Sequence, residues 1–308
     1  MRHQPLLAGA ALWLACLAPA APALAADAST CDSLTARYEA KRAELEPPQV
    51  SAALFAAADD GCDALATRLL DAGASVAARD RTGGTALTHA ARGGHDGMIV
   101  LLARHGAEVD ERNVQGSTPL YVAVEQNRFK AAGALVALGA TVNTPGRAGV
   151  TPLSAAAYNG NARLVDLLLS HGAAPRTADA SGKTPILYAA ARGFTPVVMR
   201  LLAAGTDVNA PYGNGLTVLM WAAGYANDVP PDDGVALVTL LLDRGAAIDA
   251  HDDRGRTPLM IAAGLGHDEV VDLLMRRGAD RTLRDRGGQT AADLAPTEAL
   301  RAKLASKG

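Results

Sequence analysis

A fixed internal spacing is the feature that most constrains how this chain can fold. Threonines recur at intervals of 33, 33, 33, 33, 40 and 33 residues, at Thr85, Thr118, Thr151, Thr184, Thr217, Thr257 and Thr290. Glycines in a different part of the unit repeat the same intervals, at Gly73, Gly106, Gly139, Gly172, Gly205, Gly245 and Gly278. Such a period indicates an array of stacked structural units rather than a domain with one central core.

Each unit carries signals for two short helices. Threonine followed by proline, as at Thr118 and Pro119, predicts a helix start, because the hydroxyl can cap the helix and proline lacks an N–H that the first turn does not use. Alanine pairs in this first helix allow a neighbouring helix to approach closely. A leucine four residues before each spacing glycine, as in Leu102 before Gly106, predicts a second helix that ends in a left-handed cap.

A further glycine lies two residues before each threonine and predicts a tight turn there, as at Gly255. Residues 252–263 read DDRGRTPLMIAA and residues 266–274 read GHDEVVDLL. These units resemble the ankyrin repeat, and the resemblance runs from about Ser51 to Leu304. It implies an all-α repeat solenoid of helix-turn-helix units with β-hairpin loops, about seven units including caps, that acts as a monomer.

The chain divides into four regions on this reading. Residues 1–25 form a signal peptide, and residues 26–50 form an N-terminal extension whose charged helix, 32–46, ends at Pro47. The repeat domain spans 51–304, with a C-terminal cap at 285–304. Its earlier units are an N-terminal cap repeat at 51–79 and repeats at 80–112, 113–145, 146–178, 179–211, 212–251 and 252–284.

The first residues predict export. Arg2 precedes an apolar stretch, and Ala23, Leu24 and Ala25 fit a small-x-small cleavage site. Pro19 and Pro22 interrupt the stretch before it reaches the roughly 20 residues of a membrane span. We expect cleavage after Ala25, a periplasmic protein and no membrane span in the mature chain. Secretion, or a lipid anchor on Cys16, is the alternative.

Cleavage would leave two cysteines, Cys31 and Cys62, in an oxidising compartment. Extracytoplasmic cysteines commonly pair, so we expect a disulfide that fastens the N-terminal segment to the first repeat. Two unpaired buried thiols are the alternative.

Composition and motifs point away from nucleic acid, cofactors and catalysis. The net charge is −3, from 29 basic and 32 acidic residues, with no sustained basic run to follow a phosphate backbone. We find no catalytic, nucleotide-binding or metal motif in the sequence. His105 and His171 precede cap glycines, which indicates helix capping. His95 and His267 match the family's turn between helices, and His89 and His251 are isolated.

One unit exceeds the others by seven residues, between its two helices at 225–234. Insertions in repeat arrays often serve binding. Three interpretations remain open: a solvated loop with Asp232 or Asp233 capping the next helix, a partner contact, or a metal site formed with Asp228. Calcium needs about six to eight oxygen ligands, which this loop does not readily supply.

In ankyrin proteins, ligands lie along the hairpin tips and the exposed ends of the first helices. Carried over by position, this resemblance assigns partner contacts to the tips and helix ends, and above all to the centre of the stack, because tyrosine, tryptophan and arginine dominate interface energetics. Tyr188 and Trp221 occupy equivalent positions and either pack in the core or form an exposed patch. The candidate residues are Arg81, Arg92, Gln115, Gln126, Arg147, Tyr158, Lys183, Tyr188, Arg192, Asn214, Trp221, Tyr225, Asp228, Arg254 and Arg256.

The sequence therefore favours a non-enzymatic scaffold that binds another protein, which we expect to be a periplasmic or envelope protein. A secreted effector or immunity-type protein is the runner-up, and a hydrolase or metal-binding protein built on the repeat surface is a weaker alternative.

Overall fold

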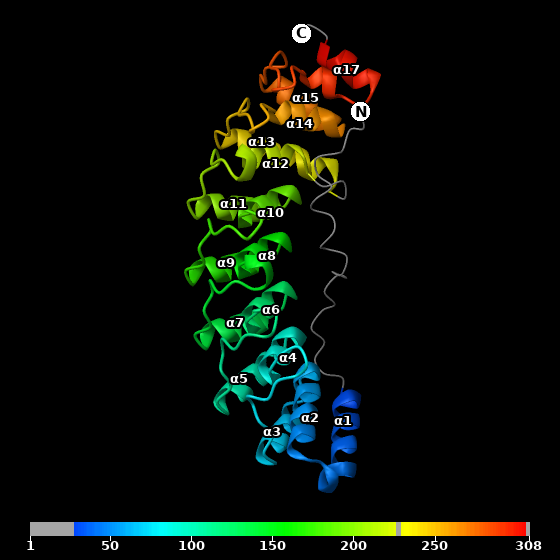
Figure 1. Cartoon of the computed structure of the whole chain (residues 1–308), viewed down its shortest axis with the longest axis vertical. Helices are drawn as coiled ribbons and strands as arrows, with labels where there is room; N and C mark the ends of the chain where they lie inside the picture. Colours follow the sequence, from blue (N-terminus) through cyan, green and yellow to red (C-terminus); the bar gives the residue numbers. More distant parts are fainter. Residues whose placement is uncertain (1–27, 226–228, 306–308) are drawn as a thin grey trace.

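The described residues form a curved stack of helix pairs (Figure 1). The computed structural model describes residues 28–225 and 229–305, so the predicted signal peptide at 1–25 lies outside the described residues. The all-α repeat solenoid is confirmed. No extended strand is assigned within these ranges, and the loops close as tight turns, one of which forms an isolated antiparallel bridge between Tyr212 and Leu216.

The first helices of the units lie on the concave side of the stack (Figure 1). The hydroxyls of Thr118, Thr151 and Thr257 accept hydrogen bonds from backbone N–H groups in the first turn, which confirms these three caps. Thr184 caps no helix: its side chain makes no bond to the first turn. The first helices are α4 (Ala86–Gly93), α6 (Pro119–Glu125), α8 (Pro152–Tyr158), α10 (Pro185–Ala191), α12 (Val218–Ala223) and α14 (Pro258–Leu265).

The second helices lie on the convex side (Figure 1). Every leucine that precedes a spacing glycine by four residues is completely buried, and every spacing glycine has a positive φ, so both predictions are confirmed. The second helices are α5 (Asp96–Arg104), α7 (Phe129–Ala137), α9 (Ala162–Ser170), α11 (Thr195–Ala203), α13 (Pro231–Asp243) and α15 (Asp268–Arg276).

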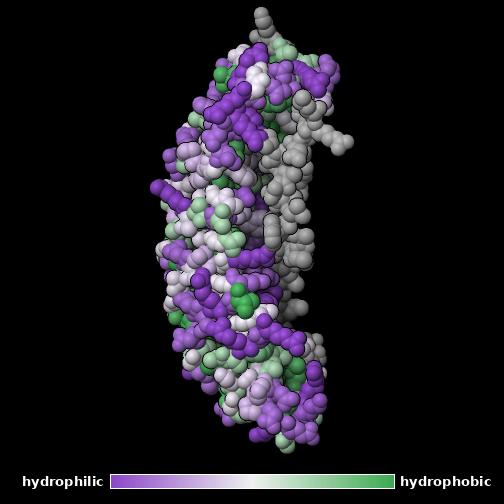
Figure 2. Space-filling model, viewed as in Figure 1, coloured by the Kyte–Doolittle hydropathy of each residue, from purple (hydrophilic) through white to green (hydrophobic). Residues whose placement is uncertain are grey.

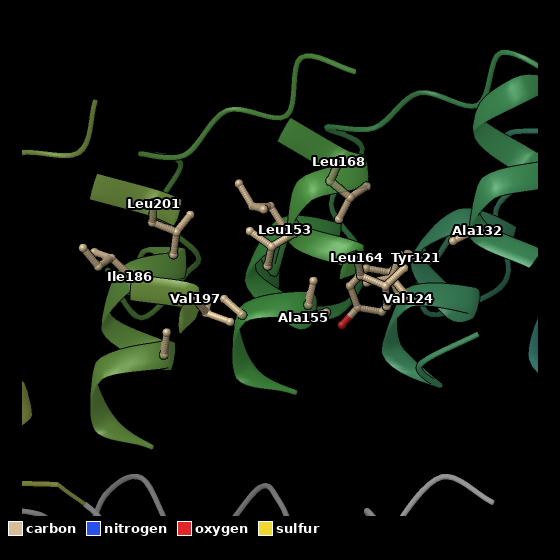
Figure 3. Close-up of a cluster of buried hydrophobic side chains, with 14 of the residues drawn as sticks. Tyr121, Val124, Ala132, Leu153, Ala155, Leu164, Leu168, Ile186, Val197 and Leu201 are labelled. Carbon is tan, nitrogen blue, oxygen red and sulfur yellow. The ribbon is translucent and has the colours of Figure 1, made fainter. Parts of the chain in front are cut away.

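Neighbouring units share a continuous apolar core. Each first helix packs against the first helix on either side, and the second helices form a parallel row of contacts. Figure 3 shows part of this core, where Leu153 and Leu164 of one unit lie between Val124 and Ile186 of its neighbours. The alanine pairs of the first helices are fully buried, as their small size requires for close helix approach.

The turns between units are held by side-chain carboxylates. Asp179 Oδ1 accepts hydrogen bonds from the backbone N–H groups of Ser181 at 2.8 Å and Lys183 at 3.1 Å. Asp80, Asp252 and Asp285 do the same in their own turns, and the amide oxygen of Asn113 takes this place in its turn. Backbone bonds also join successive turns, as from Asp253 N to Asn214 O at 2.9 Å. Among the described residues, four such backbone bonds join neighbouring turns along the stack.

Two turns lack a carboxylate or amide oxygen there, because Gly146 and Tyr212 occupy its position. These turns contain the short helices η2 (Arg147–Gly149) and η3 (Gly213–Gly215). In each of them a residue other than glycine, Ala148 or Asn214, adopts a positive φ near 60°. Positive φ is unfavourable for alanine, so the turn at Ala148 is strained.

The N-terminal boundary differs from the expectation. Helix α1 (Ala28–Lys41) is followed by η1 (Arg42–Glu44), and α2 (Pro47–Asp60) starts at the prolines that were expected only to end a helix. Proline is well suited to the first helical position, because its missing N–H has no partner there in any case. The first helix of the cap repeat therefore begins at Pro47 rather than Ser51, and α3 (Asp63–Asp71) completes the pair.

The two ends of the stack are covered in different ways. At the N-terminus, Cys31 of α1 forms a disulfide with Cys62, the residue that precedes α3. At the C-terminus, α16 (Ala291–Leu294) and α17 (Glu298–Ala305) place Leu300 and Leu304 in the core. Lys303 of α17 forms an ion pair with Asp272 at 2.8 Å. Each cap thus turns a polar outer face to solvent.

We predict that replacing both cysteines, Cys31→Ser and Cys62→Ser, lowers the melting temperature. The bond joins residues 31 positions apart, and restricting a loop of this size in the unfolded chain stabilises the fold by about 3.5 to 4 kcal/mol. Differential scanning calorimetry measures the shift. Reducing agent should lower the melting temperature of the wild-type protein by the same amount and leave that of the double variant unchanged. An equal melting temperature for all samples would contradict the pairing.

We predict that Asp252→Ala destabilises the fold by about 2 to 3 kcal/mol, because it leaves four partly buried donors of Arg254 and Arg256 without their acceptor. The Asp252 side chain is 2% exposed, and its Oδ2 accepts from Arg256 Nη2 at 2.6 Å. The neighbouring Asp253 is exposed, so Asp253→Ala is the matched control and should change stability by less than about 0.5 kcal/mol. Chemical denaturation of both variants measures the difference.

The Asp252→Ala effect should depend on pH. Burial raises the pKa of Asp252, but hydrogen bonds from Arg256 and Arg254 outweigh burial, so the folded pKa lies below its ordinary value. The carboxylate thus stabilises the fold above about pH 4, and this stabilisation is lost as the pH falls through the lowered pKa. The gap between wild type and variant should shrink between pH 7 and pH 3. A constant gap would show that the charge of Asp252 is not the cause.

Candidate functional site

Most of the candidate residues at the turns lie on the surface. Lys183 is half-buried, and five other tip residues are exposed: Arg81, Gln115, Arg147, Asn214 and Arg254. Arg256 differs, because its Nε and Nη2 both donate to Asp252 Oδ2, at 2.9 and 2.6 Å. Its guanidinium therefore stabilises its own turn, and its role as a partner contact stays a prediction.

The structure brings three of the central candidates together in a group that we call the tyrosine–arginine cluster, formed by Tyr158, Tyr188 and Arg192. The Tyr158 and Tyr188 rings meet edge to face with centroids 6.0 Å apart. The Arg192 guanidinium lies 4.8 Å from the Tyr158 ring centroid, in cation–π geometry. All three side chains are half-buried. The cluster thus joins α8, α10 and the residue after α10.

The tyrosine–arginine cluster is fixed to the adjacent turn. Tyr188 Oη donates a hydrogen bond to Asp179 Oδ2, and Lys183 Nζ lies 5.8 Å from the Tyr188 ring centroid. Burial and the Asp179 carboxylate raise the pKa of Tyr188, so the phenol remains protonated and acts as a donor. Burial opposes ionisation of Asp179, but hydrogen bonds from Tyr188 and Ser181 lower its pKa below the ordinary value.

Apolar side chains continue this surface toward the C-terminus. Trp221 is half-buried, so it contributes both to packing and to the surface, and its Nε1 is buried without an acceptor among the described residues. Ile261 is half-buried and Leu265 is 40% exposed. The residues predicted from the sequence do not include Ile261, Leu265 or Phe194, and the Phe194 ring lies 5.5 Å from the Arg192 guanidinium. The repeat register offered a signal, since Ile261 is equivalent to Tyr188 and Leu265 to Arg192.

At the N-terminal end, candidate residues take part in contacts between repeats. Arg92 Nη1 lies 3.7 Å from Asp59 Oδ1 of the cap repeat, and Gln126 ends helix α6. The sequence suggested that His89 is isolated, and the structure shows that it is not. His89 is buried and stacks on Phe55, and its two ring nitrogens lie 2.7 Å from Asp59 and 3.1 Å from Asp80. This end of the concave surface is therefore occupied by polar contacts between neighbouring units.

The ends of the seven-residue insertion pack against its neighbours. Tyr225 is 6% exposed, and its ring stacks on His267 of the next unit at 4.0 Å. Its expected role as a surface contact is therefore wrong, because the ring fills the space above Gly234, where a Cβ would lie 2.3 Å from it. Val229 is also buried, beside Gly193 of the preceding unit.

Asp232 and Asp233 do not form the helix cap that one interpretation of the insertion assigned to either of them. Asp228 lies outside the described residues. Asp232 and Asp233 are exposed in the first turn of α13, whose N-cap is Pro230. Neither aspartate caps the helix, but their charges interact favourably with the N-terminal end of its dipole.

Four histidines have the structural roles expected of them: His95, His105, His171 and His267. His105 and His171 donate from Nδ1 to Leu101 O at 2.9 Å and Leu167 O at 2.8 Å, at the ends of second helices. His267 donates to Ala223 O of the preceding unit at 2.9 Å. His95 donates from Nε2 to Asp59 O of the cap repeat at 2.8 Å.

The described residues contain neither a candidate metal-binding group nor a candidate membrane-spanning helix. Among residues 28–225 and 229–305, no group of three or more histidine, cysteine, aspartate or glutamate side chains is placed to hold a metal ion. Within the same ranges, no helix has both the length and the apolar character needed to cross a bilayer. The arrangement of the concave surface, with aromatic rings beside cations, is suited to non-covalent binding.

Comparison with known proteins gives consistent results. Models of ankyrin repeats in three copies match residues 54–146, 135–212 and 153–231. A model of ankyrin repeats in many copies matches residues 241–295, and a single ankyrin repeat matches 214–253.

Several relatives share the repeats. The chain is 36% identical over 63 residues to the ankyrin repeat-containing protein P1E11.10 of Schizosaccharomyces pombe, and 41% identical over 54 residues to human ankyrin repeat domain-containing protein 63. These matches cover 20% and 18% of this chain, and 30% and 14% of the relatives. The crystal structure of the human ASB11 ankyrin repeat domain superposes with a TM-score of 0.64 at 30% identity, covering 71% of this chain and 95% of that one. The chain belongs to the ankyrin repeat family.

Proposed function

We propose that this protein is a non-enzymatic scaffold that binds another protein through the concave surface around the tyrosine–arginine cluster. The observation that carries the proposal is the meeting of Tyr158, Tyr188 and Arg192 at the centre of the stack. Tyrosine and arginine are enriched among the residues that contribute most to binding energy, and such residues cluster near the centre of an interface. The family supports the same role, since ankyrin repeats generally mediate protein–protein interaction.

The cluster is organised before a partner arrives. Tyr188 is held by Asp179, and Arg192 lies over the Tyr158 ring, so both side chains have already lost rotamer freedom. Ordering a long side chain at an interface costs about 0.5 to 1.5 kcal/mol. A surface that is ordered in the free protein avoids this cost on binding.

We propose further that the partner is a periplasmic or envelope protein. Support comes from the sequence at residues 1–25, which has the features of a cleaved signal peptide, and from the disulfide between Cys31 and Cys62, which is typical of an oxidising compartment.

We predict that the mature protein begins at Ala26 and is found in the periplasmic fraction. Fractionation of a Gram-negative expression host, followed by N-terminal sequencing, measures both. Recovery from the medium would favour a secreted protein, and recovery from membranes with a blocked N-terminus at Cys16 would favour a lipid anchor. An intact N-terminus in the cytoplasm would contradict export.

We predict that Tyr158→Ala with Arg192→Ala abolishes capture of the partner. Mature protein immobilised on beads would be exposed to periplasmic extract, and bound proteins would be identified by mass spectrometry. Removing two central side chains of this kind should weaken binding at least about 30-fold, since each costs 1 kcal/mol or more.

The matched control removes two exposed side chains far from the cluster. It uses Arg104→Ala and Arg276→Ala, which lie on the convex side. This variant should capture the same partner as wild type. Equal capture by both double variants would show that the cluster is not the binding site.

A further inference from the structure

The tips of the turns carry an excess of positive charge, although the whole chain has a net charge of −3. The four tip residues before each repeat threonine include one exposed carboxylate among the described turns, that of Asp253. The carboxylates at the bases of the turns are occupied by backbone N–H groups, as described above. We name the remaining tip cations the basic rim: Arg81, Arg147, Lys183, Arg254 and Arg286.

Next to the basic rim runs a row of partly exposed apolar and aromatic side chains, which we name the apolar strip: Tyr158, Tyr188, Trp221, Ile261 and Leu265. The helices that carry these residues, α8, α10, α12 and α14, contact one another in order. Gly224 lies directly against the strip, because a Cβ there would lie 3.0 Å from Ile261 and 3.3 Å from Leu265. On the face drawn in Figure 2, by contrast, hydrophobic residues are scattered among hydrophilic ones.

The basic rim and the apolar strip belong to one surface. Lys183 of the rim lies over the ring of Tyr188 of the strip, 5.8 Å from its centroid. Arg254 lies in the equivalent turn of the 252–284 unit, at the register position of Ser181, whereas Arg256 has the position of Lys183 and is paired with Asp252. The rim and the strip therefore meet at Lys183 and Tyr188, and Arg254 adds positive charge at the turn that precedes Ile261.

We propose that the partner presents a segment in which acidic side chains alternate with apolar ones, so that carboxylates meet the basic rim and apolar side chains cover the strip. This inference rests on the proposed function and specifies the chemistry of the partner. Complementary charge favours encounter and fixes register, while burial of apolar surface supplies most of the affinity.

The test uses synthetic peptides made of repeated Glu-Glu-Leu units. Trp221 reports binding through its fluorescence. The chain has two tryptophans, Trp13 and Trp221, so Trp13→Phe in the full-length protein leaves Trp221 as the single tryptophan. Two comparison peptides replace glutamate by lysine or leucine by serine. An oligothymidylate strand serves as a nucleic-acid polyanion.

We expect the Glu-Glu-Leu peptide to change Trp221 emission with saturation, and each comparison ligand to bind at least about tenfold more weakly. Lys183→Glu with Arg254→Glu should weaken binding about tenfold, whereas Arg104→Glu with Arg276→Glu on the convex side should not. Melting curves verify folding, and Arg254→Glu alone, whose backbone bonds remain, should show a smaller loss in the same direction.

Three results would overturn the proposed chemistry: equal binding of the lysine peptide, equal binding of the charge-reversed protein, or no response to the glutamate peptide. If oligothymidylate bound as tightly as the peptide, the ligand of this surface would be a nucleic acid rather than a protein segment. None of these results affects partner capture through Tyr158 and Arg192, so the peptide experiment tests the proposed chemistry of the partner and the capture experiment tests the scaffold function.

Discussion

Burial of one helix pair against the next is the interaction on which the whole structure depends. The first helices of the repeats have only six to eight residues, whereas isolated helices shorter than about 12 to 15 residues are marginal in water. Their stability must come from packing between units, through the completely buried leucines of the second helices and the alanine pairs of the first. Because each unit contacts only its neighbours, the core grows with length and the surface stays elongated.

The turns convert this packing into a defined binding surface. Carboxylates such as those of Asp179 and Asp252 hold the turn backbone, and the bonds between successive turns set their spacing. The positions of Lys183 and Arg254 are thereby fixed relative to the helix ends below them. A surface organised in this way can combine cations, aromatic rings and aliphatic side chains without any flexible segment having to order on binding.

The periodic features were predictable from sequence, because the same physical requirement recurs in every unit. Capping threonines, buried leucines and left-handed glycines each occupy one register position, and nearly all behave alike. The errors concern residues whose environment is unique. Tyr225 could not be recognised as buried without knowing that His267 of the next unit faces it, and Arg256 could not be assigned to Asp252 from spacing alone.

The candidate site was predictable to the same extent. Repeat register placed Tyr158 in one unit and both Tyr188 and Arg192 in the next, but their contacts depend on the distance between neighbouring helices, which the sequence does not state. His89 shows the limit most clearly. Its two aspartate partners come from different units, 30 residues before it and 9 residues before it, so no local pattern reveals them.

Deleting one internal unit tests the central claim most directly. A chain that lacks residues 113–145 retains the caps, the disulfide and the tyrosine–arginine cluster, and joins two units of the same register. If stability comes from contacts between neighbours, circular dichroism should show the same helical signal per residue and a cooperative melt at a lower temperature. Loss of the helical signal would show that the fold depends on a single indivisible core, and would contradict the account.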